Sequence, residues 1–376
     1  MTNFAEELFN KYDIFKENSL NNRRIKHKDI LPLIQKRNNN FLIEEIGKSY
    51  EGREIFLLKI GEGSAKIMLW SQMHGDEATA TQALFDIFNF FENNKLFKDE
   101  INQILKQCTL YFVPMLNPDG AERFTRRNAQ GIDINRDALR LEAPESKILM
   151  NLRDKLNADF GFNLHDQDAW YSAGDTKYPA TLSFLAPTFN SEKEINNTRK
   201  KSMQVIVSMN KVLQKIIPKQ VAKYDDGFMP TAFGDNIQKR GTSTILIESG
   251  AYLNDVEKQF VRKLNFVSIL HALYSISNNN YEKESAEDYH KIPFNKKNKL
   301  FDYILRNVIV NGEFGTYKAD IGIRRKQLSE KDILVIEDVG DLSNNFGFFE
   351  KDAEQSIIKE ISIGEDADFI FEKFFI

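Results

Sequence analysis

The chain has 376 residues, which exceeds one typical domain and allows a substantial buried core. Its 51 Lys and Arg residues against 55 Asp and Glu residues give a net charge of -4, and it has no sustained basic stripe with interleaved aromatics, so we expect no nucleic-acid partner. A single cysteine rules out an intramolecular disulfide framework, and no apolar run approaches the length that spans a bilayer, so we expect no membrane partner.

Residues 1–45 predict a helical lead-in to the rest of the chain. Two short segments, at 6–9 and 30–33, are its expected packing anchors. The first 20 residues mix Glu, Asn and Lys among apolar residues, and they lack the cationic start and apolar core of a secretory signal. We therefore expect a cytoplasmic protein.

Residues 46–280 predict one domain. Short buried runs alternate there with helical stretches at 79–91, 146–156 and 255–275. Such alternation favours an α/β fold, in which a mixed twisted sheet is flanked by helices. Open sheets of this kind bind their ligands at strand ends.

A possible metal-binding pair follows the apolar run at 67–70. In His74-Gly75-Asp76-Glu77, an imidazole and a carboxylate stand three residues apart where a strand gives way to a helix. Zinc is the natural metal for such a pair. Taken alone the pair is a weak signal, because His and Glu fall three apart by chance in many helices.

Two further side chains stand at the ends of predicted strands. His165 follows a short apolar run, and a distant third ligand beside a close pair is typical of a catalytic zinc site with one open position. Glu248 ends the β-branched run at 244–247, and burial of a carboxylate there is costly unless it has a role. Considered singly, His165 could be a hydrogen-bonded core histidine and Glu248 a cap for the next turn.

The segment between these motifs is rich in arginine and amides. Asn117-Pro118-Asp119-Gly120 has the composition of a tight turn, and the loop at 125–137 carries few apolar residues. The loop is either an ordinary solvated basic loop or an anion receptor, because guanidinium groups bind carboxylates in bidentate fashion and can stabilise an oxyanion.

Taken in order, these motifs resemble the zinc metallocarboxypeptidase family, the relatives of carboxypeptidase A. The HxxE pair, NPDG, TRxNxxGxDxNR, a strand ending in His and a strand ending in Glu span roughly residues 50–252. The resemblance implies that His74, Glu77 and His165 bind one zinc ion per chain. It also implies that Glu248 is the general base.

The same resemblance assigns substrate-binding roles. Arg126 would polarise the scissile carbonyl, while Asn135 and Arg136 would bind the terminal carboxylate of the substrate. Asp133 would orient His74, a common role for a carboxylate behind a zinc histidine. Tyr224 is the candidate for the mobile tyrosine that closes over substrate in this family.

Several positions depart from the digestive members of the family. HGDE lacks the arginine that carboxypeptidase A carries beside its zinc glutamate, and it is more similar to bacterial relatives that include murein peptide amidases. Asp137 stands where the family more often has Asn. An acidic cluster in the expected specificity region could bind a cationic substrate group or form a solvated loop; its members are Asp225, Asp226 and Asp235.

Residues 291–376 predict a small β-rich accessory domain after the polar segment at 278–285. Short β-rich runs alternate there with Gly, Asn and Asp turns. No histidine follows His290, so we expect a role in packing or substrate access and no second metal centre.

The sequence thus predicts a zinc-dependent carboxypeptidase that removes a C-terminal residue from a small peptide with a free carboxylate. A murein peptide amidase acting on diaminopimelate-containing peptides and a small-molecule deacylase of the same superfamily are the alternatives. A zinc-binding protein that recognises carboxylates without catalysis is the alternative from another class.

Overall fold

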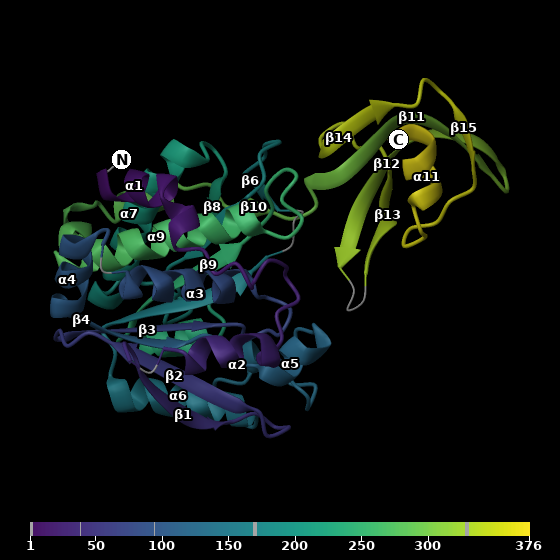
Figure 1. Ribbon diagram of the computed structural model, residues 1–376. Helices are drawn as coiled ribbons and strands as arrows, with labels where there is room; N and C mark the ends of the chain where they lie inside the picture. Colours follow the sequence, from purple (N-terminus) through teal and green to yellow (C-terminus); the bar gives the residue numbers. More distant parts are fainter. Residues whose placement is uncertain (1–2, 38, 94, 168–170, 328–330) are drawn as a thin grey trace.

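The computed structural model describes residues 3–37, 39–93, 95–167, 171–327 and 331–376, and its centre is a mixed sheet flanked by helices (Figure 1). Eight strands follow the order β1-β2-β4-β3-β5-β9-β7-β8. Their bounds are β1 Leu42–Lys48, β2 Glu54–Ile60, β3 Ala65–Ser71, β4 Cys108–Val113, β5 Phe160–Asp166, β7 Leu182–Leu185, β8 Val221–Lys223 and β9 Ser243–Ser249. The predicted fold class is confirmed.

The four central strands β4, β3, β5 and β9 run parallel to one another. They are nearly continuous apolar runs because helices cover both faces of the sheet. In β3, Ile67 and Leu69 face one core, whereas Met68 and Trp70 face the other. The alternation therefore divides a single apolar run between two hydrophobic layers.

Helices on the two faces complete these layers. The larger core packs against α3 Thr79–Glu92, α7 Asn197–Ile216 and α9 Gln259–Ser277. The smaller core packs against α6 Pro144–Leu156 and α8 Phe233–Lys239. The helix α4 Lys98–Gln107 precedes β4 and contacts α9. No helix in the described ranges is both long and apolar enough to cross a membrane.

The N-terminal segment packs on the larger core. It contains α1 Asn3–Asn10, the 3-10 helix η1 Tyr12–Ile14 and α2 His27–Gln35. The ring of Phe15 lies 5.4 Å from that of Phe90 and 5.7 Å from that of Phe266. Buried Asp86 accepts hydrogen bonds from the Tyr12 hydroxyl at 2.8 Å and from Arg262 Nε at 2.7 Å. The first helices are therefore tied to α3 and α9.

Two local expectations differ from the structure. The NPDG segment begins a helix, α5 Pro118–Arg123, because proline suits its first turn and the Asn117 side chain accepts a hydrogen bond from Gly120 N at 2.9 Å. The last long helix starts at Gln259 instead of 255. There Asp255 Oδ2 accepts hydrogen bonds from the first amides of α9, and Lys258 adopts a left-handed backbone at φ 52°.

A second sheet forms most of the C-terminal part, in the order β13-β12-β11-β14 with β15 beside β11. Its elements are β11 Leu300–Gly312, β12 Gly315–Gln327, β13 Asp332–Gly340, β14 Phe346–Asp352, β15 Ile357–Lys359 and the helix α11 Asp368–Phe374, which packs on the sheet. Figure 1 shows this sheet to one side of the larger one.

Short elements join the two parts. Strand β6 Ser172–Ala173 pairs with β10 Asn295–Lys296, after η3 Asn280–Lys283 and α10 Glu287–His290. At the N-terminus of β13, Asp332 Oδ1 accepts a hydrogen bond from Arg24 Nη2 at 3.0 Å. A strand pair just before the C-terminal sheet and an ion pair at β13 thus link the C-terminal part to the α/β part.

Candidate active site

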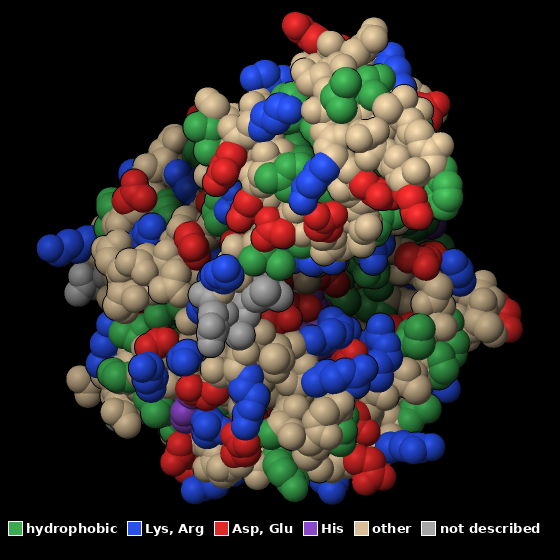
Figure 2. All heavy atoms as spheres, turned by 90° about the vertical axis from the view of Figure 1, so that its right-hand side faces the viewer, with side chains coloured by type: hydrophobic (Ala, Val, Ile, Leu, Met, Phe, Trp, Pro, Cys, Tyr) green, Lys and Arg blue, Asp and Glu red, His purple; other side chains and the backbone are tan. Residues whose placement is uncertain are grey.

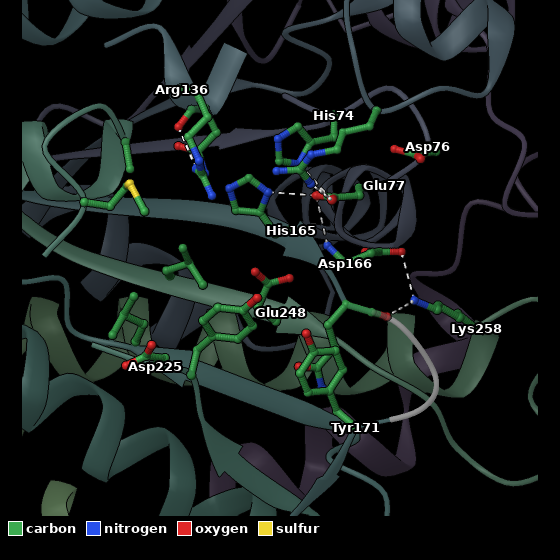
Figure 3. A pocket seen from close by; sticks show the side chains of 18 of the residues that line it. His74, Asp76, Glu77, Arg136, His165, Asp166, Tyr171, Asp225, Glu248 and Lys258 are labelled. Atoms are coloured by element: carbon green, nitrogen blue, oxygen red, sulfur yellow. Dashed lines mark hydrogen bonds and ion pairs between the residues drawn. The ribbon is translucent and has the colours of Figure 1, made fainter. Parts of the chain in front are cut away.

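The predicted site residues come together at one edge of the central sheet. His165 is the next-to-last residue of β5, Glu248 is the next-to-last residue of β9, and the loop after β3 carries His74 and Glu77. Because these strands are parallel, their C-terminal ends meet at the same edge. A cavity of about 590 Å³ opens there, and all four side chains line it (Figure 3).

Three of these side chains converge on one point. His74 Nδ1 lies 2.8 Å from Glu77 Oε1, and His165 Nδ1 lies 2.7 Å from Glu77 Oε2. One ligand atom from each residue falls within 4.8 Å of the other two, and all three side chains are at least nine-tenths buried. Two imidazoles and one carboxylate match the donor set of a catalytic zinc site.

The contacts behind His74 also fit a metal ligand. Its second ring nitrogen, Nε2, lies 3.1 Å from Asp133 Oδ1, so its Nδ1 atom is turned toward Glu77. Burial disfavours the charged imidazole, but the Glu77 and Asp133 carboxylates outweigh it and raise the pKa of His74 to about 9. Because a ligating imidazole must be deprotonated, a metal ion would displace this proton.

Arg126 lies against the same group. Its Nε donates to Asp133 Oδ2 at 3.0 Å, and its Nη1 lies 3.1 Å from His74 Nδ1 and 3.4 Å from Glu77 Oε1. The side chain is 43% exposed, toward the cavity that it lines. Asp133 therefore contacts both His74 and Arg126, which fixes the ring and the guanidinium relative to each other.

The Glu248 carboxyl group points into the cavity beside His165 (Figure 3). Burial raises its pKa well above the ordinary value, and the nearby Glu77 carboxylate adds to the effect. A carboxyl group in this environment has a higher proton affinity than one in water, which suits a group that must accept a proton and release it again.

Asn135 and Arg136 line the cavity from the 3-10 helix η2 Ile134–Arg136. Asn135 Oδ1 accepts a hydrogen bond from Phe233 N at 3.0 Å, which joins η2 to the start of α8. Arg136 Nη1 donates to the main-chain oxygen of Asn135 at 2.8 Å. Arg136 forms no ion pair with any residue that the structure describes, so its charge faces the cavity without a carboxylate partner.

Tyr224 reaches the cavity from the residue after β8. Its main-chain nitrogen donates to Phe184 O at 2.8 Å, and its ring lies 6.2 Å from that of Tyr171. Burial raises the pKa of Tyr224 above the ordinary value, and the Glu248 charge adds to this. Tyr224 is thus a neutral hydroxyl donor near Glu248.

The acidic cluster is divided by the fold. Asp225 and Asp235 line the cavity, and burial raises the pKa of Asp235 to about 6. Asp226 instead accepts hydrogen bonds from Lys193 Nζ at 2.7 Å and from Arg199 Nη2 at 2.9 Å. Two of the three carboxyl groups therefore lie at the cavity without a cationic side-chain partner among the described residues.

Four charged residues that the sequence did not point to also line the cavity, and these are Asp166, Lys258, Arg325 and Lys326. Lys258 Nζ donates to Ser249 O at 2.8 Å, to Gln167 O at 3.2 Å and to Asp166 Oδ2 at 3.3 Å. Only Asp166 had a sequence signal, its position directly after His165. Lys258 comes from a loop, and Arg325 and Lys326 come from β12. None of these segments carries a motif.

Several known proteins are similar to this chain. Residues 28–216 match the zinc carboxypeptidase family. Carboxypeptidase SOL1 of Arabidopsis thaliana is 32% identical over 127 residues, or 29% of this chain and 26% of that protein. Carboxypeptidase B of Astacus astacus is 27% identical over 190 residues, or 50% of this chain and 57% of that protein. The chain thus spans about a quarter of the first relative and a little more than half of the second.

A solved structure has the same fold. The metallo-carboxypeptidase from Burkholderia cenocepacia superimposes with a TM-score of 0.56 at 16% sequence identity, and the match covers 68% of this chain and 70% of that one.

Proposed function

Because the chain belongs to the zinc carboxypeptidase family, we propose that it is a zinc-dependent carboxypeptidase, which hydrolyses the bond before the C-terminal residue of a small peptide. One observation carries this proposal. A possible metal-binding triad, a half-buried carboxyl group and an arginine without an anionic partner among the described residues line the same cavity. Metal ligands, a base and a carboxylate anchor are the parts that such a hydrolysis requires.

The metal would be held by His74 Nδ1, the Glu77 carboxylate and His165 Nδ1. Zinc bound there would supply Lewis-acid polarisation of the scissile carbonyl and would lower the pKa of water. Asp133 would keep the His74 ring in its ligating orientation through the contact at Nε2.

Glu248 would act as the general base. Its raised proton affinity supports acceptance of a proton from the attacking water and transfer of that proton to the leaving amine. Arg126, held by Asp133 beside the triad, would stabilise the negative charge that develops on the carbonyl oxygen. Tyr224, which lines the same cavity, would contact the substrate.

Arg136 and Asn135 would bind the terminal carboxylate. Guanidinium matches a carboxylate in bidentate fashion, and Arg136 has no competing ion pair among the described residues. This anchor would place the last peptide bond of a substrate at the triad, which is what distinguishes an exopeptidase from an endopeptidase.

A murein peptide amidase is the second candidate function. Asp225 and Asp235 line the same cavity as Arg136, which favours a substrate that carries an amine close to its carboxylate. A diaminopimelate-containing peptide has both groups. A hydrolysis screen that includes such peptides would separate this candidate from an enzyme for ordinary peptides.

The proposal is tested by the charge at the substrate's C-terminus. Wild-type protein should hydrolyse a free-acid peptide far faster than its C-terminal amide. Arg136→Ala should lose activity on the acid and discriminate little between the two, because the two changes remove opposite partners of one ion pair and their effects overlap. Arg140→Ala, at an exposed arginine on the same loop, is the matched control. Equal hydrolysis of acid and amide by the wild type would overturn the carboxypeptidase assignment.

A further inference from the structure

The C-terminal sheet forms part of the cavity wall. Arg325 and Lys326, near the end of β12, line the same cavity as the metal-binding triad. Figure 2 shows this face of the molecule, where a hollow separates the upper part from the lower part and Lys and Arg side chains border it. The accessory domain therefore presents cationic groups to whatever enters the cavity.

Arg325 is the cation of this wall that lacks a partner. It is partly buried, yet its guanidinium makes no hydrogen bond or ion pair with any residue in the described ranges; only its main-chain nitrogen is engaged, by Asp302 Oδ2 at 2.8 Å. Lys326 Nζ instead lies 3.8 Å from Glu337 Oε2. A partly desolvated guanidinium without an anion retains its affinity for a carboxylate.

Arg325 lies at the end of the cavity away from Arg136. It also lines a neighbouring smaller cavity together with Lys258 and Tyr252, and Arg136 does not. Figure 3 shows Arg136 and Lys258 on opposite sides of the triad. The cavity therefore has a cation without a carboxylate partner toward each end, with the triad and Glu248 between them.

This arrangement gives the substrate a direction, on the premise of the proposed function. If Arg136 binds the terminal carboxylate and the scissile bond lies at the triad, the chain before that bond must leave toward Lys258 and Arg325. Lys258 is already occupied by Asp166 and two main-chain oxygens, which leaves Arg325 available.

We propose that Arg325 binds an acidic side chain of the residue directly before the scissile bond, so that the preferred substrates are peptides with Glu or Asp at that position. The accessory domain would then be a determinant of specificity. Its contact is made by a side chain outside the α/β part, and the preference requires the C-terminal sheet in its observed position.

Three peptides that differ only in the residue before the scissile bond test the proposal. With Glu, Gln or Lys there, we expect wild-type kcat/KM to be roughly 5- to 10-fold higher for Glu than for Gln, mainly through KM, as for a partly exposed ion pair. The preference should weaken at high salt, because salt screens such a pair.

Variants locate the effect. Arg325→Gln should lose the preference for Glu over Gln, and Arg325→Glu should shift the preference toward the Lys peptide. Lys318→Gln, at an exposed lysine of the same strand that does not line the cavity, should keep the wild-type preference. Equal kcat/KM for the Glu and Gln peptides, or a Glu preference that survives in Arg325→Gln, would overturn the inference.

The outcomes separate this inference from the proposed function. Absence of hydrolysis for every peptide would count against the carboxypeptidase assignment. Calorimetric binding of the three peptides to the Glu248→Gln variant would still measure the Arg325 contact. Hydrolysis of all three peptides without a charge preference would leave the proposed function standing and exclude Arg325 as a determinant.

Discussion

His165 and Glu248 lie directly opposite each other in the parallel pairing of β5 with β9. Main-chain hydrogen bonds between adjacent core strands fix this pair, so the proposed third metal ligand and the proposed base do not depend on a loop for their relative position. The next pair in the register is Asp166 and Ser249, and there Lys258 Nζ contacts both strands. One lysine thus links the ends of both strands beside the site.

Metal content tests the triad. If His74, Glu77 and His165 hold zinc, the dialysed protein should contain one zinc ion per chain by elemental analysis, and His165→Ala should contain far less because one of three ligands is gone. His290→Ala, at an exposed histidine outside the cavity, is the control. Stoichiometric zinc in the His74→Ala, His165→Ala double variant would show that the metal binds elsewhere.

Glu248→Gln separates binding from chemistry. The substitution keeps the shape of the side chain but removes the proton acceptor, so kcat should fall by roughly 10³-fold or more while zinc content and peptide binding persist. Steady-state kinetics and calorimetry measure the two effects. Glu142→Gln, at an exposed position, should behave as wild type. Near-normal turnover in Glu248→Gln would assign the base to another residue.

Lys258→Met should destabilise the protein. The substitution leaves the buried Asp166 carboxylate without its ammonium partner, which typically lowers the free energy of unfolding by about 3–5 kcal/mol. Asp166→Asn in the same chain should recover part of the loss, because no buried charge then remains. Urea unfolding of the two single variants and the double variant measures the coupling. Strictly additive losses would mean that the pair does not act as a unit.

The stability of the fold should fall as the pH drops from about 6.5 to about 4. Burial between α7 and α9 lowers the pKa of His271 to about 4, and its Nε2 lies 3.0 Å from Ser208 Oγ. Between these pH values His271 is protonated in the unfolded chain but stays neutral in the folded one. This difference should lower the free energy of unfolding by up to roughly 3 kcal/mol across that window.

The variant His271→Gln isolates the contribution of this histidine to the pH dependence of stability. The difference in unfolding free energy between wild type and variant, measured by urea titration at several pH values, should shift in favour of the variant as the pH falls. The contributions of the carboxylates, which both proteins share, cancel in this difference. A difference that stays constant from pH 7 to pH 4 would assign the acid sensitivity to other groups.

The sequence by itself determined the α/β fold class and the candidate residues of the triad. Apolar runs such as 67–70 and 244–247 have no polar face, which requires a strand covered on both sides, and short-range spacing placed His74 beside Glu77. Motif order then connected these residues to His165 and Glu248. These features are local or depend on chain order, so pattern and chemistry suffice to find them.

Only the tertiary structure decided which other side chains share the cavity. Lys258 contacts the strand ends from a loop, and Arg325 lines the cavity from a separate sheet. Asp226 pairs with Arg199 and does not line the cavity with the other two aspartates. No periodicity or spacing in the sequence predicts any of these contacts. They arise because long-range packing brings distant segments to one strand edge, where charge pairing then determines which groups remain available to a ligand.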